Sequence, residues 1–443
     1  MTKISVIGVG YVGLPTAVGF AAKGNNVIAV TTTPSKAEMI NKGKPPIYEQ
    51  GLEKLLKRVL KSKKFRATTD MKDAIMKSDI TFIAVGTPSD KKGKIDLSQI
   101  EKASMQIGEI LREKKSYQVI VVKSTVVPGT TESIVLPAIE KSSGKKAGTD
   151  FGLAMNPEFL REGVALDDFL NADRIVIGAI DEKSASIIAK CYAKFRAPIV
   201  KTNTKTAELI KYTSNSLFAT LVSFSNEMAN ISEKIDGIDN NLLFESVHLD
   251  KRLTINGEKA GIAHYIQSGC GYGGSCFPKD VNAIINHAEN IGYSPKLLKE
   301  VKRINNERTE RIIKNVEKIM KLKGKTVSLL GVAFKADTDD LRHSQALKLL
   351  SHLLNKNAII KVYDPMAMKN LPELKNVIKC TSTREALDSA DIAFIMTDWA
   401  EFKKLKENDF SPMRNQVVYD AKHILPPMKT VKVYTPGMAI KKN

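Results

Sequence analysis

Short apolar runs alternate with amphipathic stretches over the first 200 residues. The apolar runs are rich in Val and Ile and predict strands at residues 4–9, 26–31, 79–86, 118–124, 152–157 and 174–178. Between them, as in residues 11–24 and 51–63, apolar side chains recur at the spacing of an amphipathic helix. This βα rhythm predicts a doubly wound, mostly parallel sheet.

The pattern changes at Thr204. Residues 204–235 contain no proline or glycine and carry apolar residues on more than one helical face. They predict a long helix that is buried between domains or between subunits. A glycine-rich segment and further helices follow, to about Leu322.

A second βα rhythm then begins, with strands expected at 324–334, 359–365, 391–398 and 416–422. We therefore predict an α/β fold with two Rossmann-like, doubly wound lobes, joined by the long central helix and a helical middle domain. The predicted domains are 1–203, 204–322 and 323–443.

Composition narrows the class of protein. The chain has 443 residues, 43% hydrophobic and 26% charged, which is typical of globular proteins with two or three domains. No apolar run approaches the roughly 18 residues of a membrane span. The first residues enter a strand at once and leave no room for a signal peptide, so we expect a cytoplasmic protein without a membrane partner.

Charge and cysteine content exclude other classes. The net charge is +20, but the lysines are scattered and no nucleic-acid-binding motif occurs, so we expect a lysine-rich surface and no nucleic-acid partner. Four cysteines and six histidines show no metal-ligand spacing, and four cysteines are too few for a disulfide scaffold. We therefore expect no metal.

Gly8, Gly10 and Gly13 form a G-x-G-x-x-G motif between the first predicted strand and its helix. The first glycine permits a tight turn, the second lets a pyrophosphate approach the backbone, and the third lets helix and strand pack closely. The free N–H groups of the helix then face the phosphates. The motif predicts a dinucleotide site.

The end of the second strand lacks the acidic residue that usually holds the ribose 2′-hydroxyl. Thr31, Thr32 and Thr33 stand there, with Lys36 nearby. Threonines do not repel a 2′-phosphate and Lys36 can bind one, so both NAD and NADP remain possible.

The loop "GCGYGGSCFPKD", residues 269–280, carries the candidate nucleophile Cys276. A free cysteine is more commonly a small buried hydrophobe. Here Gly273 and Gly274 would let a substrate approach, and Lys279 and Asp280 supply a cation and a potential base within one turn. Cys270 lacks such neighbours and is interpreted as structural.

Polar residues on the long helix and on two loops could join this thiol. Glu208, Lys211 and Asn215 share one helical face in an otherwise apolar sequence. Two loops that follow predicted strands carry Ser124 and Thr125 in one case, and Glu158, Arg161 and Glu162 in the other. Such loops lie at the carboxyl edge of a sheet, where ligands bind in these folds.

These motifs together resemble the nucleotide-sugar 6-dehydrogenase family, over the whole chain. The resemblance rests on "GVGYVGLP", "VGTPSD", "KSTVVPGT", "NPEFLREGVALDDFLNADRIVIG", "AELIKYTSNSLFATLVSFSNE", "GYGGSCFPKD" and "GVAFKADTDDLRHS". It implies a four-electron oxidation of a sugar C6 hydroxyl to a carboxylate with two NAD(P)⁺, and a homodimer built around the long helix.

The resemblance also implies residue roles. Cys276 would hold the aldehyde as a thiohemiacetal and then as a thioester; Lys211 and Asn215 would stabilise oxyanions; Asp280 would pair with Lys211 and aid proton transfer. Thr125 and Glu158 would surround an ordered water. The implied cofactor residues are Gly8, Gly10, Tyr11, Val12, Gly13, Thr31, Lys36, Thr87, Thr125 and Glu162. The implied substrate residues are Glu158, Phe159, Leu160, Lys211, Asn215, Arg252, Gly273, Lys335 and Arg342.

Within the family, the segments around Glu158 and Cys276 resemble the UDP-glucose branch. GDP-mannose and UDP-N-acetylhexosamines are the alternatives, and a non-catalytic nucleotide-sugar binder or redox sensor is a further one. The chain departs from the family in residues 253–270, which are longer than usual, and at Gln345, where proline is common and a small effect is expected.

Overall fold

The computed structural model describes residues 1–90 and 93–441. The chain forms two compact units, Met1–Ser214 and Asn215–Asn443, and helix α9 (Thr204–Ser232) contains the boundary. The three domain ranges expected from the sequence stay a prediction.

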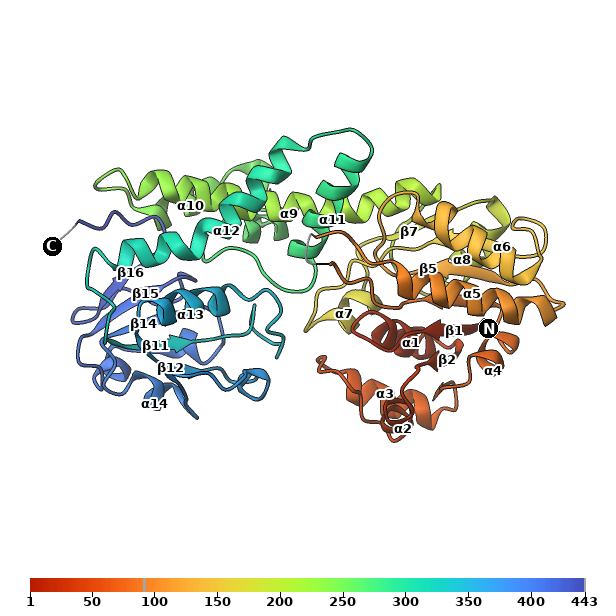
Figure 1. Ribbon diagram of the computed structural model, residues 1–443, viewed down its shortest axis with the longest axis horizontal. Coiled ribbons are helices and arrows are strands. Elements are labelled where there is room, and N and C mark those ends of the chain that lie inside the picture. Colours follow the sequence, from red (N-terminus) through yellow and green to blue (C-terminus); the bar gives the residue numbers. More distant parts are fainter. Residues whose placement is uncertain (91–92, 442–443) are drawn as a thin grey trace. The chain divides into compact units, whose positions relative to one another are not determined.

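The first unit is built on an eight-stranded sheet in the order β3-β2-β1-β4-β5-β6-β7-β8 (Figure 1). All neighbouring strands are parallel except β6 and β7. The strands are β1 Lys3–Ile7, β2 Asn26–Val30, β3 Phe65–Thr68, β4 Ile80–Ile83, β5 Val119–Val122, β6 Gly152–Met155, β7 Ile175–Ala179 and β8 Ile199–Thr202.

Helices cover both faces of this sheet. They are α1 Gly13–Ala22, α2 Pro34–Asn41, α3 Leu52–Lys61, α4 Met71–Met76, α5 Ser98–Glu113, α6 Leu136–Ser143 (preceded by the π-helix Thr131–Val135), α7 Ala165–Leu170 and α8 Glu182–Cys191. Along β5, Val119 and Val121 pack in one core with α1, α3 and α8, whereas Ile120 and Val122 pack in another with α5 and α6. A strand buried on both sides explains the continuous apolar runs of the sequence.

The second unit begins with helices. They are α10 Asn240–His248, α11 Phe277–Asn290 and α12 Lys296–Val316, with 3₁₀ turns at Lys251–Leu253 and Gly261–Tyr265 and the short hairpin β9 Thr254–Ile255 and β10 Glu258–Lys259. The hairpin and the second turn lie within residues 253–270, the segment expected to be longer than usual; that difference in length stays a prediction.

A six-stranded, wholly parallel sheet follows, in the order β13-β12-β11-β14-β15-β16 (Figure 1). Its elements are β11 Thr326–Leu330, α13 Gln345–Asn355, β12 Ile359–Tyr363, β13 Val377–Lys379, α14 Thr383–Leu387, β14 Ile392–Ile395, β15 Val417–Asp420 and β16 Lys432–Tyr434, with 3₁₀ turns at Met368–Asn370, Phe402–Lys404 and Glu407–Phe410. The order matches that of the first six strands of the chain, so the prediction of two Rossmann-like lobes is confirmed.

Several short strands were not expected. β3, β8, β13 and β16 span only three or four residues. β8, β13 and β16 carry half-buried or exposed side chains, and β3 alternates buried with half-buried ones, so no continuous apolar run marks them. They lie at or near sheet edges, where one neighbour supplies the hydrogen bonds and the sequence signal is weak.

Candidate active site

The glycine motif has the geometry of a dinucleotide site. Gly8 adopts φ +107° and a Cβ there would collide with the carbonyl of Ala84. A Cβ on Gly13 would collide with the carbonyl of Gly8, whereas Gly10 faces open space. The three glycines therefore serve a tight turn, a close helix–strand contact and a clear approach for a ligand, as the motif predicts. The residues present fit a bound dinucleotide, and Tyr11 and Val12 lie in the same turn.

The ribose end of the motif lacks an acidic residue. Thr31 follows β2, is buried, and its Oγ1 accepts a hydrogen bond from the Thr33 backbone N–H at 3.3 Å. Helix α2 begins at Pro34, and Lys36 is exposed in its first turn.

The loops after β4 and β5 are tied together. The Thr87 hydroxyl donates to the Thr125 carbonyl at 2.8 Å, and the Ser124 hydroxyl donates to the Val85 carbonyl at 2.7 Å. These bonds hold Thr125 at the carboxyl edge of the sheet, the edge at which the glycine turn also lies.

Lys211 and Glu158 form a buried ion pair in the first unit. The distance from Lys211 Nζ to Glu158 Oε1 is 3.0 Å, and each side chain is only 4% exposed. Glu158 Oε2 also accepts from the Leu160 backbone N–H at 2.6 Å. Burial raises the pKa of Glu158, but the charges of Lys211 and Lys123 and this hydrogen bond outweigh it, so its pKa lies below the usual range. The carboxylate is therefore held ionised.

A second buried lysine belongs to this cluster and was missed in the sequence. Lys123, directly after β5, donates from Nζ to Asn156 Oδ1 at 3.0 Å. Burial and the charge of Lys211 lower the pKa of Lys123 to about 7, although Glu158 opposes them. The available signal was an ionisable residue that follows four apolar ones at the carboxyl end of a strand.

Glu208 has a structural role. Its carboxylate accepts from the backbone N–H of Gly129 at 2.5 Å and of Thr131 at 2.8 Å, and from the Thr131 hydroxyl at 2.7 Å. It thereby anchors the loop after Thr125 to helix α9. Burial raises the pKa of Glu208 despite these bonds.

Residues on either side of Glu158 in this loop make further contacts within the first unit. The guanidinium of Arg174 lies 3.9 Å from the centroid of the Phe159 ring, and Lys211 Nζ lies 5.7 Å from it. Arg161 pairs with Asp168 at 2.6 Å. Leu160 and Glu162 are half-buried in the turn between β6 and α7.

In the second unit, Cys276 is the N-cap residue of α11 and is half-buried. Its Sγ lies 3.6 Å from the Ser275 hydroxyl oxygen. Cys276 stands at the amino end of a 14-residue helix, and the positive end of a helix dipole favours a thiolate. The role of Cys276 as the nucleophile stays a prediction.

Asp280 lies one turn beyond the thiol and is 1% exposed. It accepts from Asn215 Nδ2 at 2.6 Å and pairs with Lys279 at 2.5 Å. The amide and the carboxylate predicted from sequence are therefore in direct contact. The expected pairing of Asp280 with Lys211 stays a prediction.

The glycines before Cys276 have a packing role that the sequence did not indicate. A Cβ on Gly273 would collide with the carbonyl of His343, and a Cβ on Gly274, at φ +83°, would collide with the Phe334 ring. Both glycines let the loop pack against residues 331–345. Substrate approach along Gly273 stays a prediction.

Two of the three cationic residues assigned to the substrate form ion pairs with nearby aspartates. Arg342 forms a bidentate contact with Asp340, its Nε lying 2.9 and 2.8 Å from the two carboxylate oxygens. Lys335 Nζ lies 5.9 Å from the Phe334 ring centroid. Arg252, beside the hairpin, pairs with Asp250 and is 88% exposed, so nothing within the described residues of its own unit encloses it.

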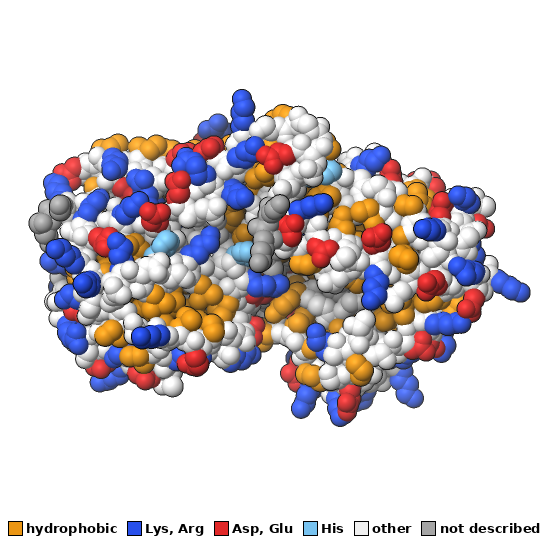
Figure 2. All heavy atoms as spheres, in the orientation of Figure 1, with side chains coloured by type: hydrophobic (Ala, Val, Ile, Leu, Met, Phe, Trp, Pro, Cys, Tyr) orange, Lys and Arg blue, Asp and Glu red, His pale blue; other side chains and the backbone are white. Residues whose placement is uncertain are grey.

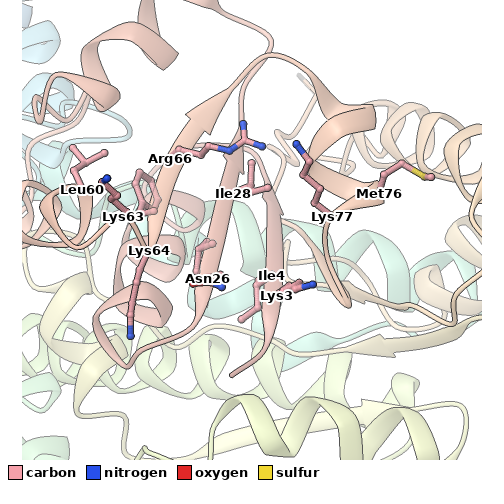
Figure 3. Close-up of a pocket in the computed structure, with 12 residues that line it drawn as sticks. Lys3, Ile4, Asn26, Ile28, Leu60, Lys63, Lys64, Arg66, Met76 and Lys77 are labelled. Atoms are coloured by element: carbon pink, nitrogen blue, oxygen red, sulfur yellow. The ribbon is translucent and has the colours of Figure 1, made fainter.

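A basic groove of about 720 Å³ lies elsewhere in the first unit (Figure 3). It is lined by Lys3, Lys63, Lys64, Arg66 and Lys77 among others. Lys3 begins β1, so the groove lies at the amino ends of the strands, opposite the edge that carries the glycine turn. It is not part of the site described above. The face shown in Figure 2 has Lys and Arg dispersed among acidic and apolar side chains.

Comparison with known proteins gives the family. Residues 2–196 match the NAD binding domain, 205–307 the central domain and 328–427 the UDP binding domain of the UDP-glucose/GDP-mannose dehydrogenase family. The chain belongs to this family. The expected resemblance is confirmed, and the protein is an NAD(P)-binding oxidoreductase of nucleotide sugars.

Its relatives in this dehydrogenase family act on more than one sugar. UDP-glucose 6-dehydrogenase AglM of Haloferax volcanii is 41% identical over 96% of this chain and 97% of its own length. GDP-mannose 6-dehydrogenase of Pseudomonas putida is 37% identical over 91% and 92%, respectively. The solved UDP-glucose dehydrogenase of Pyrobaculum islandicum is 39% identical, with a TM-score of 0.88 over 96% of this chain and 95% of that one. Within residues 1–90 and 93–441, no helix is long and apolar enough to cross a membrane.

Proposed function

We propose that this dehydrogenase oxidises the C6 hydroxyl of UDP-glucose to the carboxylate of UDP-glucuronate. The observation that carries the proposal is Cys276 at the N-cap of α11, with buried Asp280 one turn away. A thiol so placed can keep the aldehyde bound between two oxidations, which a single-step alcohol dehydrogenase does not need. The relatives named for UDP-glucose support this sugar.

The proposed reaction consists of two oxidations with a covalent intermediate on Cys276 between them. When bound at the glycine turn, NAD(P)⁺ would supply the hydride acceptor for both oxidations. In the first step the alcohol loses a hydride and a proton and becomes an aldehyde. The Cys276 thiolate then adds to the carbonyl carbon, and the resulting oxygen anion is protonated to give a thiohemiacetal. Loss of a second hydride and a proton leaves a thioester, which water cleaves to the acid and the free thiol.

The buried polar groups suit these charges. Lys211 and Asn215 are donors for the oxyanions of addition and hydrolysis, because a preorganised donor in a dry site gains most from developing charge. Glu158, held ionised by Lys211, is the candidate base for the hydrolytic water. Asp280 is assigned to proton transfer beside the thiol.

A panel of nucleotide sugars tests the substrate. We expect UDP-glucose to be oxidised with two reduced cofactors formed per sugar, measured at 340 nm together with the product by mass spectrometry. GDP-mannose and UDP-N-acetylmannosamine serve as the competing substrates. One reduced cofactor per sugar would contradict the thiol mechanism. A preference for another sugar would be compatible with that mechanism but would show that UDP-glucose is not the substrate.

The cofactor is proposed to be NAD, with NADP also accepted. No carboxylate within the described residues directly follows β2, so a 2′-phosphate meets the hydroxyl of Thr31 and the exposed ammonium of Lys36 rather than a like charge. Running the same panel with both cofactors measures this preference. The proposed location is the cytoplasm.

The protein is also proposed to be a homodimer through helix α9. Exposed or half-exposed apolar residues recur along it at alternating spacings of four and three: Leu217, Leu221, Phe224, Met228, Ile231 and, just beyond the helix, Ile235. Phe224 is 50% exposed and Ile231 is 48% exposed. This heptad pattern is that of a helix which pairs with a second helix.

Phe224→Asp is expected to shift the dimer to monomers. A carboxylate at the centre of the apolar stripe would have to be desolvated on association. Light scattering coupled to size exclusion at micromolar concentration measures the change. Ile378→Asp, at a similarly exposed apolar position on strand β13 (46% exposed), should leave the mass unchanged. A monomeric unmodified protein would overturn the proposal.

A further inference from the structure

Gln345 is a buried amide that contacts the loop of the candidate thiol. It is the first residue of α13 and is 4% exposed. Its Nε2 donates to the Tyr272 carbonyl at 2.6 Å. Tyr272 lies four residues before Cys276, in the same glycine-rich loop.

The carbonyl oxygen of the same side-chain amide makes no hydrogen bond within the described residues. This atom, Gln345 Oε1, is buried. A buried unpaired acceptor is unfavourable, so the side chain is not explained by general stability. Its favourable contact is the bond to Tyr272.

The helix does not need glutamine at this position. The preceding residue, Ser344, has φ −59° and ψ 130°, which is the backbone that a following proline requires. The first helical position tolerates proline because its N–H has no partner inside the helix. The Ser344 hydroxyl already caps the helix by accepting from the Ala346 N–H at 3.2 Å. Proline would therefore fit at position 345, and the side-chain contact is what glutamine adds.

Tyr272 is a fixed point of the loop. Asn305 binds both of its backbone groups, accepting from the N–H at 2.7 Å and donating to the carbonyl at 3.0 Å. Two residues later, the Gly274 N–H donates to the Arg342 carbonyl at 3.0 Å. Since Gly273 and Gly274 have no side chains to restrict the chain, these backbone bonds determine where Cys276 begins α11.

We propose that Gln345 is a positioning residue for Cys276. Its amide bonds the Tyr272 carbonyl and so joins residues 331–345 to the thiol loop. This role rests on the proposed thiol chemistry, and it would make the effect of residue 345 larger than the small effect expected from the sequence.

Two variants test this role. Gln345→Pro keeps the helix start and removes the amide, and Gln345→Met keeps the length of the side chain without the donor. In both we expect kcat to fall by about threefold to tenfold, the worth of one neutral hydrogen bond, while KM for UDP-glucose changes less than twofold. We also expect the apparent pKa of Cys276, from the pH dependence of its alkylation by iodoacetamide, to rise by about 0.5 as the thiol moves from the helix end.

The thiol titration separates positioning from stability. Cys191, Cys270 and Cys380 are buried, so alkylation reports on Cys276, as peptide mass spectrometry verifies. Gln118→Met is the matched control, because Gln118 is a buried glutamine that donates to Thr81 at 2.6 Å in the first unit. It should lower the melting temperature and leave the thiol titration unchanged.

The proposal fails if both Gln345 variants keep the unmodified thiol pKa, whether or not kcat and melting temperature fall. Alkylation requires no turnover, so this result stands apart from the nucleotide-sugar panel. An enzyme inactive on every sugar would overturn the proposed function, yet a raised thiol pKa in both variants would still support positioning by Gln345.

Discussion

Cys276→Ser is expected to abolish formation of the carboxylate, with a fall in kcat of at least about 10³-fold. A serine hydroxyl cannot match the thiolate population of a cysteine at a helix N-terminus, nor form an ester that water cleaves as readily as a thioester. One reduced cofactor per active site, without net turnover, is the expected residual reaction. Rapid mixing followed at 340 nm, with quenched product analysis, measures both quantities.

Cys380→Ser is the matched control. Cys380 is 3% exposed in the core of the second unit, and burial raises the pKa of its thiol to about 11. Its thiol lies 3.8 Å from the Ile378 carbonyl, a bond that a hydroxyl can also donate. This variant should keep the activity. Full turnover by Cys276→Ser would exclude the covalent mechanism.

Lys211→Met is expected to lower kcat by about 10²–10³-fold, the effect of removing one donor from an oxyanion site. The same change leaves Glu158 buried without its partner at 3.0 Å. Breaking such a pair destabilises a protein by roughly 3–5 kcal/mol. Steady-state kinetics and urea unfolding measure the two effects.

The pH dependence of stability should change in a defined direction. In the unmodified protein the pKa of Glu158 is lowered, so its contribution is present above the ordinary glutamate pKa and is lost as pH falls through the folded value. Without Lys211, less positive charge offsets the effect of burial, so the pKa of Glu158 in the folded protein rises. Stability should then decline at a higher pH.

Lys205→Met is the comparison for this variant. Lys205 lies on the same helix, is 62% exposed and pairs with Glu132 at the surface. Solvent-exposed ion pairs contribute little to stability. The kinetics of Lys205→Met and the pH dependence of its stability should therefore match those of the unmodified protein. Equal losses in both variants would contradict the role of Lys211.

The features that could be predicted from the sequence are those whose residues lie close together along the chain. The relation of Cys276 to Asp280 follows from four residues of one helix, and the glycine turn follows from six residues between a strand and a helix. Apolar periodicity likewise predicted both lobes, because strands buried on two faces need continuous apolar runs. These features are local, and the structure has them in the expected places.

The cluster of Lys123, Glu158 and Lys211 depends instead on contacts between residues that are distant in the sequence. Its members come from a strand end, a loop and a long helix, and neither burial nor pairing of each lysine can be read from its neighbours in the chain. The lowered pKa of Lys123 exists only because folding removes water from around it.

The sequence by itself determined which chemical groups this protein carries, a dinucleotide turn and a thiol four residues before a carboxylate, and it indicated a family that oxidises nucleotide sugars. Tertiary structure alone decided how those groups are held. Glu208 anchors a loop rather than joining the cluster, the glycines before Cys276 fit against residues 331–345, and Gln345 reaches the thiol loop across 73 positions of sequence. Local patterns specify which groups exist, whereas packing of distant elements specifies which groups meet.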